Sequence, residues 1–260
     1  LAIISVIILG AIFADIIVPY DYGIKQVIPD RLQGPSLKHL FGTDDLGRDL
    51  FSRVIHGSRS SLVLGILTTA VATLIGGFLG GICAYYGNRV DNIIMRLLDV
   101  ITSIPSTLLS LSIVAALGPG IRNLVIAITV SRVPTFARVI RSAVLNIVNQ
   151  EYIEAAKAGG TRNLRIMLRH VYPNAMSPII VQCTMSISQL ILQAAGLSFL
   201  GMGMQPPAPE WGALLNSARD FMRTAPHLML FPGIAIVLAA LAFNLVGDGL
   251  RDAFDPRLKS

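Results

Sequence analysis

Apolar residues dominate this chain of 260 residues and fall into long runs. A helix needs roughly 20 mainly apolar residues to cross the hydrocarbon core of a bilayer. Six runs reach or approach that length, and the second contains no charged residue. The pattern predicts an all-α membrane protein with about six transmembrane helices, whose even number would place both termini on one side. The runs are residues 1–19, 62–85, 97–117, 123–140, 177–200 and 227–246.

The first run is interpreted as a transmembrane helix rather than a signal peptide. It lacks a small-residue cleavage pattern followed by a soluble domain, and further apolar runs follow it. The chain begins at Leu1 rather than at Met. A short preceding segment is therefore expected to be missing.

Charged residues interrupt the third and fourth runs. Asp99 is close to the start of its run, whereas Arg132 lies near the middle of the next and is the deepest charge in the chain. Ionisable groups inside a bilayer are costly and indicate function by default, although a group near a helix end can reach interfacial water. Asp99 could pair with Arg96 on the same helix face. An ion pair between Asp99 and Arg132 is a second hypothesis, although their depths would differ by roughly 9 Å.

Between the first two runs, an amphipathic pattern follows Thr43 and Asp44, either of which could cap a helix. This pattern predicts a helix lying along the membrane surface. Its apolar stripe would comprise Leu46, Leu50, Val54 and Ile55, with Arg48, Asp49 and Arg53 facing away.

Glycines cluster in the second run. Gly76 and Gly80 form one G-x-x-x-G pair, and Gly77 and Gly81 form another. Small residues at this spacing allow a second helix to approach closely. The partner helix could belong to this chain or to another.

A polar, basic stretch covers residues 151–173. Good helix formers are followed by Gly159 and Gly160, which suit a helix end. Thr161 could cap a second helix that Pro173 closes. The pattern alone suits either a protein-docking surface or a basic helix on anionic lipid. The second helix would carry an apolar face of Leu164, Met167, Leu168 and Val171, with Arg162, Arg165 and Arg169 on the remainder.

Composition supports a membrane protein and excludes several other classes. Hydrophobic residues make up 53% and charged residues 14%, against about 25% charged in soluble proteins. The net charge of +6 indicates anionic lipid rather than nucleic acid, because the aromatic residues lie mostly within or beside the apolar runs.

Known catalytic and metal-binding motifs are missing from the sequence. There is no phosphate-binding G-x-x-x-x-G-K-[ST], no H-E-x-x-H and no G-x-S-x-G. Cys83 and Cys183 are expected to be small buried hydrophobes. Met202 and Met204 have no nearby histidine and do not make a nickel site. No metal site, bound cofactor or enzymatic activity is expected of this chain.

The stretch 151–173 resembles the EAA signature of permease subunits of bacterial ABC importers. Tyr172 stands where Leu is usual in that motif, and His170 where Ile is usual. The resemblance implies a cytoplasmic helix-turn-helix that couples to a separate ATPase. It assigns Ala155 and Ala156 to close helix contact, Glu154 to a polar contact or cap, and Gly160 to the bend. The residues expected at the coupling surface are Glu154, Ala155, Ala156, Gly159, Gly160 and Arg165.

Four other stretches resemble the dipeptide, oligopeptide and nickel branch of these importers: residues 42–54, 96–109, 197–212 and 243–258. In that branch the last forms a cytoplasmic tail, which here would include Arg257. A helix like residues 96–109 lines the path between two permease subunits. The candidates for that pathway are Asp99, Ser103, Ser106 and Arg132.

The resemblance implies a type I ABC importer permease over residues 1–260. It would comprise a first helix at 1–19, an extracytoplasmic segment with a surface helix at 20–61 and a five-helix core at 62–260. The expected partners are a second homologous permease, two cytoplasmic ATPase subunits that bind ATP and Mg²⁺, an extracytoplasmic substrate-binding protein and membrane lipid, but no nucleic acid.

The expected function is peptide import across the bacterial cytoplasmic membrane, with both termini inside. Nickel or glutathione import is the alternative within the branch, and a membrane scaffold or passive channel the alternative outside it. The orientation rests on the resemblance, because eleven basic residues fall on the expected inner side and nine on the outer.

Overall fold

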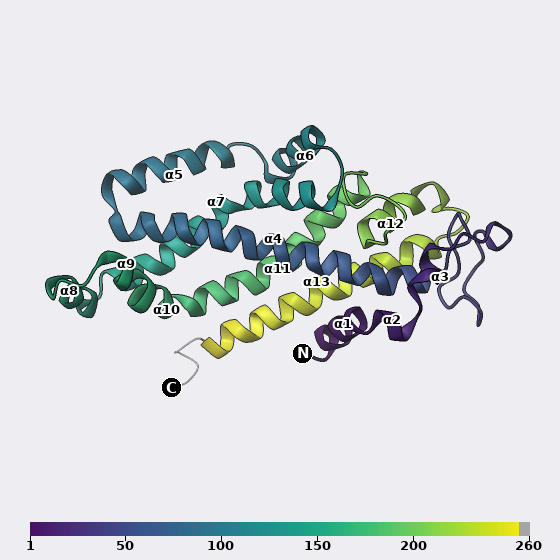
Figure 1. The fold of residues 1–260 in the computed structure, drawn as a ribbon, viewed down its shortest axis with the longest axis horizontal. Coiled ribbons are helices and arrows are strands. Elements are labelled where there is room, and N and C mark those ends of the chain that lie inside the picture. The colour runs from purple at the N-terminus through teal and green to yellow at the C-terminus, as the bar shows by residue number, and fades with distance from the viewer. Residues whose placement is uncertain (255–260) are drawn as a thin grey trace.

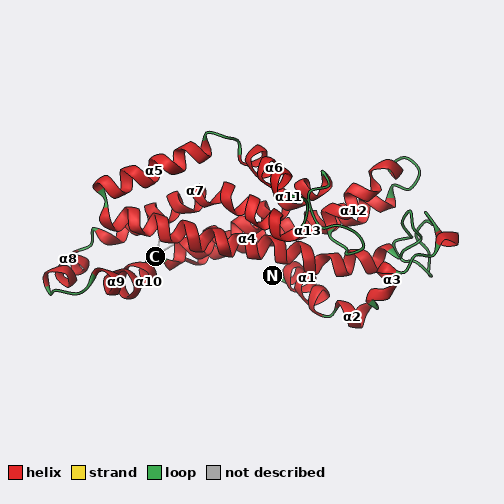
Figure 2. Cartoon of the chain, turned by 45° about the horizontal axis from the view of Figure 1, so that its top comes forward, coloured by secondary structure: helices red, strands yellow, loops and turns green. Residues whose placement is uncertain are grey.

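Four long helices lie side by side and form the body of the molecule (Figure 1). The computed structural model describes residues 1–254, and the predicted tail beyond them, with Arg257, lies outside the described residues. Each long helix is apolar enough to cross a bilayer. Residues 1–254 contain no strand (Figure 2), so the all-α prediction is confirmed. The long helices are α4 (Leu50–Tyr86), α7 (Ile121–Val148), α11 (Met176–Phe199) and α13 (His227–Phe254).

The predicted third span is broken in two. Its halves, α5 (Asn88–Thr102) and α6 (Ser106–Leu117), meet at 80°. The break lies at Pro105, which lacks an N–H and disfavours helical geometry in Ile104 before it. A single continuous helix over 97–117 is therefore wrong, although the bent pair passes as one span.

The N-terminal run forms two short helices, α1 (Ala2–Ile12) and α2 (Ala14–Ile17). At 11 residues, α1 is shorter than the roughly 20 that a span requires. Residues 1–254 thus hold four helices that are long and apolar enough to span a bilayer, or five with the bent pair, and α1 as a shorter apolar helix. This number agrees roughly with the predicted six.

The glycine cluster packs α4 against α7 of the same chain. A Cβ on Gly76 would lie 2.7 Å from the Phe136 Cβ atom, and one on Gly80 would overlap the carbonyl oxygen of Ala137. Real carbon atoms do not approach so closely, so only glycine permits this backbone separation. The helix that packs against these glycines therefore belongs to this chain and not to another.

The polar segment after α2 contains α3 (Tyr20–Ile24) and the short η1 (Ile28–Asp30), but not the predicted surface helix. Asp49 caps α4 directly, since its carboxylate accepts from the Ser52 backbone N–H at 2.8 Å. The residues before it form a tight loop, in which Gly47 has a φ of +73°. Because α4 starts at Leu50, the predicted helix start at residue 62 is also wrong.

The arginines of this segment are buried rather than turned away from the protein. Arg48 donates from Nε to Asp44 at 2.7 Å, and Arg53 donates from Nη1 to the Gly23 carbonyl oxygen at 3.0 Å. Both side chains are below 5% exposed. The predicted outward orientation is wrong, because α3 and the loop before α4 cover this face and supply acceptors.

Between α11 and α13 lie α12 (Trp211–Ala218) and η3 (Arg219–Phe221). Trp211 is buried and donates from its indole nitrogen to the Val54 carbonyl oxygen at 2.9 Å. The Glu210 carboxylate caps α12 through the backbone N–H groups of Gly212 and Ala213. These contacts attach α12 to the start of α4.

Candidate functional site

A helical hairpin over residues 151–174 projects from one end of the bundle (Figure 1). α8 (Glu151–Ala158) ends at Gly159, and Gly160 adopts a φ of +75°, which glycine takes without strain. The Thr161 N–H then donates to the Ala156 carbonyl oxygen at 3.1 Å, as in a Schellman helix end. The predicted helix, glycine break and second helix are therefore present.

The second limb differs from the prediction. It comprises α9 (Asn163–Ile166), the π-helical η2 (Met167–Val171) and α10 (Tyr172–Asn174). Arg162, not Thr161, holds the N-cap position of α9. Pro173 does not close the limb, because it lies in the first turn of α10, where a missing N–H is tolerated.

Buried side chains attach the hairpin firmly to the bundle. Ile153, Ile166 and Val171 are fully buried in a cluster with residues of α4 and α7. The Tyr85 hydroxyl of α4 also donates to the Asn163 side-chain oxygen at 2.9 Å. A movement of the hairpin would therefore be transmitted to these two helices.

The opposite side of the hairpin exposes apolar side chains to the outside. Leu164 and Leu168 are 67% and 60% exposed, and Tyr152 is 46% exposed. The predicted single apolar face is wrong, because the wider π turn shifts the helix phase and buries Met167 and Val171 instead. We call Tyr152, Ala155, Leu164 and Leu168 the hairpin patch.

The residues predicted at the coupling surface separate into two groups. Ala156 is half-buried and packs against the cluster beneath the hairpin, so it supports the hairpin itself. The others face outward from the hairpin and are available to a partner. These are Glu154, Ala155, Gly159, Gly160 and Arg165.

The candidate pathway residues do not form one site. Asp99 accepts from Arg138 Nη2 of α7 at 2.7 Å, so both of its predicted pairings, with Arg96 and with Arg132, are wrong. The register of α5 along α7, in which Asp91 also meets Arg141, brings Arg138 rather than Arg132 opposite Asp99. Ser103 is exposed, and its hydroxyl donates to the Val100 carbonyl oxygen of its own helix at 2.7 Å.

Arg132 belongs to a polar network that joins three helices. Its Nε atom donates to Gln193 Oε1 of α11 at 2.7 Å, and Gln193 Nε2 donates to Ser110 Oγ of α6 at 3.1 Å. The Ser110 and Ser131 hydroxyls lie 2.8 Å apart. Ser106 contributes its carbonyl oxygen, which accepts from Ser110 at 2.8 Å.

The sequence interpretation missed Gln193, although a signal for it exists. Gln182, Ser186, Gln189 and Gln193 recur at spacings of four, three and four within an otherwise apolar run. That spacing places them on one helix face. A polar stripe on a membrane helix faces protein or water rather than lipid.

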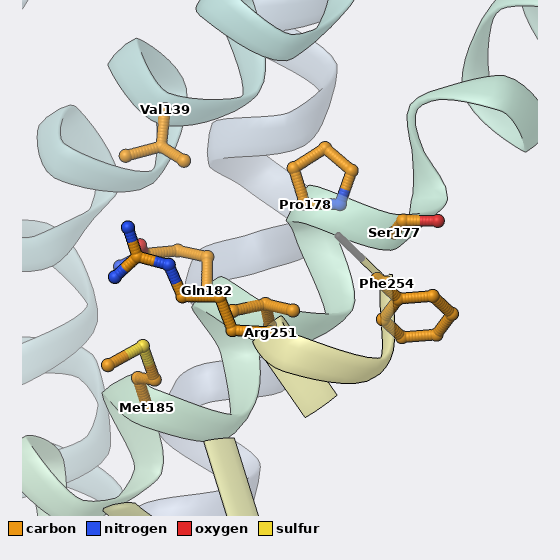
Figure 3. Close-up of a pocket in the computed structure, with 8 residues that line it drawn as sticks. Val139, Ser177, Pro178, Gln182, Met185, Arg251 and Phe254 are labelled. Atoms are coloured by element: carbon orange, nitrogen blue, oxygen red, sulfur yellow. The ribbon is translucent and has the colours of Figure 1, made fainter. Parts of the chain in front are cut away.

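The end of this stripe nearest the hairpin, at Gln182, borders a cavity of about 480 Å³ between α7, α11 and α13. Gln182 and Met185 of α11 line it together with Val139 of α7. The Arg251 side chain of α13 also extends into it (Figure 3). The polar face of α11 therefore runs from the Arg132 network to this cavity near the hairpin end.

Residues 72–260 match the protein family described as binding-protein-dependent transport system inner membrane component. The dipeptide transport system permease protein DppC of Alkalihalophilus pseudofirmus is 48% identical over 260 residues, which are all of this chain and 85% of that protein. The glutathione transport system permease protein GsiD of Pectobacterium atrosepticum is 47% identical over 251 residues, covering 96% of this chain and 83% of that protein.

Solved structures confirm the predicted fold. A chain of the inward-facing MetNI methionine ABC transporter superposes with a TM-score of 0.63 at 19% identity, covering 77% of this chain and 95% of that one. An amino acid ABC transporter crystallised with histidines gives a TM-score of 0.58 at 20% identity, covering 80% of this chain and 95% of that one. With the family match over residues 72–260, these similarities show that the chain belongs to the inner membrane components of binding-protein-dependent transport systems, the permease subunits of ABC importers.

Proposed function

We propose that this permease imports peptides across the cytoplasmic membrane and takes its energy from separate ATPase subunits that bind the hairpin. The hairpin patch is the observation that carries the proposal. It exposes apolar side chains at one end of the molecule, yet its buried side is attached to α4 and α7. A surface that is both exposed and rigidly connected suits the transmission of force from a docked partner.

The coupling contact comprises Glu154, Ala155, Gly159, Gly160 and Arg165, with Ala156 supporting them from beneath. Two ATPase subunits, a second homologous permease and a substrate-binding protein complete the transporter. This chain contributes no nucleotide site and binds no cofactor, and ATP and Mg²⁺ belong to the ATPase subunits.

The hairpin end faces the cytoplasm in this proposal. The C-terminal end of α13 lies toward that end, and α1 runs away from it (Figure 1). This arrangement supports cytoplasmic termini and an extracytoplasmic location for residues 20–61.

Peptides are the proposed substrates because the DppC relative is named for dipeptide transport. Glutathione is the second candidate, because the GsiD relative is nearly as similar and is named for glutathione transport. Nickel stays a third possibility within the branch that the sequence resembles.

Reconstitution of the complete transporter in proteoliposomes tests this proposal. Labelled dipeptide, glutathione and nickel are offered with and without ATP and the binding protein. We expect dipeptide uptake that needs both. Uptake without ATP, or purification of the chain in mild detergent without any ATPase, would instead indicate a passive channel or a scaffold.

Two variants of the hairpin test the coupling contact. We expect Glu154→Arg and Gly160→Asp to lower dipeptide uptake at least about tenfold. The first reverses a charge whose hydrogen bond contributes about 1.5–3 kcal/mol, and the second places a side chain on a backbone with a φ of +75°, which favours glycine. Both proteins should remain in the membrane. Glu151→Arg, in the first turn of the same helix, is the matched control and should transport normally. Normal uptake and normal ATPase stimulation in the first two variants would reject the coupling assignment.

A further inference from the structure

The Arg132 guanidinium lies close to the middle of α7, and no carboxylate among residues 1–254 forms an ion pair with it. Only its Nε atom has a hydrogen-bond partner among residues 1–254, namely Gln193. Asp99, its candidate partner, is bound to Arg138 instead. A charge at this depth in a membrane protein is costly and is retained for function by default.

The network around Arg132 holds the guanidinium in one orientation. Gln193 is 9% exposed, and Ser110 fixes the amide so that its oxygen faces Nε. Ser131, one residue before Arg132, is bonded to the same Ser110 hydroxyl. Because only Nε is used, the two terminal nitrogens remain as a fork that matches the geometry of a carboxylate.

The polar stripe of α11 continues from this fork toward the hairpin end. Gln189 is exposed and lies one turn from Gln193 in the direction of the hairpin. Gln182 lies roughly 16 Å from Gln193 along the helix in the same direction. At that level Gln182 shares the cavity of about 480 Å³ with Arg251 (Figure 3). A solute leaving Arg132 would meet amide groups and then a second guanidinium.

We propose that Arg132 binds a free carboxylate of the transported solute partway across the membrane, and that the polar face of α11 lines the exit toward Arg251. The assignment rests on the proposed function in peptide import, since dipeptides and glutathione both carry a carboxylate that is ionised at neutral pH. Gln193, Ser110 and Ser131 orient the guanidinium and do not themselves hold the carboxylate.

The complete transporter in proteoliposomes tests this assignment with labelled dialanine as the probe. We expect Arg132→Gln to lower uptake per ATP hydrolysed at least about tenfold, the effect of losing a charge-assisted hydrogen bond. Arg132→Lys keeps the charge but loses the two-pronged geometry of the guanidinium, so it should recover only part of the uptake that Arg132→Gln loses. Arg122→Gln removes an exposed arginine from the start of the same helix and should behave as the unmodified protein.

Different results of this experiment would reject the Arg132 assignment alone or the proposed function as a whole. Stimulation of ATP hydrolysis by the binding protein and co-purification of the second permease should persist in Arg132→Gln. Normal uptake per ATP in this variant would overturn the Arg132 assignment alone. Loss of the second permease from the complex would also overturn it, by showing that Arg132 pairs with that subunit. If the unmodified transporter takes up neither labelled dialanine nor labelled glutathione, the proposed function itself fails and the assignment fails with it.

Discussion

At the residue scale, two ion pairs hold α5 against α7. Asp91 accepts from both Nε and Nη2 of Arg141, and Asp99 accepts from Arg138 Nη2. The pairs differ in exposure, since the Asp91 side chain is 16% exposed and the Asp99 side chain 64%. Water screens the exposed pair strongly, so the two should differ in strength.

We therefore expect Asp91→Asn to destabilise the purified protein more than Asp99→Asn does. The first change breaks a partly buried bidentate pair and should cost about 1–3 kcal/mol, whereas the second should cost less than about 1 kcal/mol. Thermal unfolding in detergent measures both variants under the same conditions. Equal shifts of the two midpoints would contradict this ranking.

Glu210 gives the stability of the protein a dependence on pH. Burial raises the pKa of this carboxyl above its usual 4.5, despite hydrogen bonds from the Gly212 and Ala213 N–H groups and from the Ser61 hydroxyl at 3.2 Å. The folded protein then binds the Glu210 proton more tightly than the unfolded chain does. The contribution of Glu210 to the free energy of unfolding is therefore fully present at low pH and is lost as the pH rises above 4.5.

We expect the thermal midpoint of Glu210→Gln, relative to that of the unmodified protein, to increase as the pH is raised from 4.5. The glutamine cannot lose a proton, so the variant lacks this loss of stability. Unfolding is followed in detergent across a pH series for both proteins. A midpoint difference that stays constant over the series would show that Glu210 does not titrate in this way.

At the scale of elements, the π-helical η2 decides which side chains the hairpin exposes. A regular α-helix would place Leu164, Met167, Leu168 and Val171 on one face. The wider turn buries Met167 and Val171 and leaves Leu164 and Leu168 outside. The hairpin thereby has one apolar side for the bundle and another for a partner.

We expect Leu164→Asp and Leu168→Asp to abolish co-purification of the ATPase subunits while the permease stays folded. Each change places a charge in a contact that would otherwise be dehydrated. Leu37→Asp is the matched control, because Leu37 is fully exposed. It belongs to the segment between α3 and α4, which lies at the end of the molecule opposite the hairpin (Figure 1). Retention of the ATPase by both hairpin variants would exclude the patch from the contact.

At the scale of the whole molecule, the packing of α4 on α7 supports both candidate regions. α4 supplies Tyr85 beneath the hairpin, and α7 carries Arg132 and leads directly into α8. The close approach at Gly76 and Gly80 sets the separation of these two helices. A change there should affect the hairpin and the polar network together.

We expect Gly80→Ala to lower the stability of the protein by about 1–3 kcal/mol, because the added methyl group would force the backbones apart. Gly10→Ala, where a Cβ would meet no atom within 4 Å, is the control and should not lower stability, since alanine is favoured over glycine within a helix. Thermal unfolding of the purified proteins compares them. Similar midpoints for both variants would show that α4 and α7 can separate at no cost.

The helical class, the approximate positions of the four long helices and the glycine break at Gly160 followed from the sequence alone. The thickness of the bilayer fixes how many apolar residues a spanning helix needs, and the conformation of a glycine depends on its immediate neighbours. These local features can be predicted without knowing which helices are adjacent in the folded protein. The EAA signature belongs to the same category, because its residues are consecutive.

The partners of individual side chains were decided only by the tertiary structure. Arg48 and Arg53 were expected outside and are buried, because α3 and the loop before α4 bring acceptors to them. Arg132 bonds to Gln193 of α11 and Asp99 of α5 bonds to Arg138, because the packing of α11 and α5 against α7 fixes which groups meet. The sequence by itself determined where the chain is helical and apolar, and the arrangement of the helices decided which polar groups face one another, because those contacts join residues far apart in the chain.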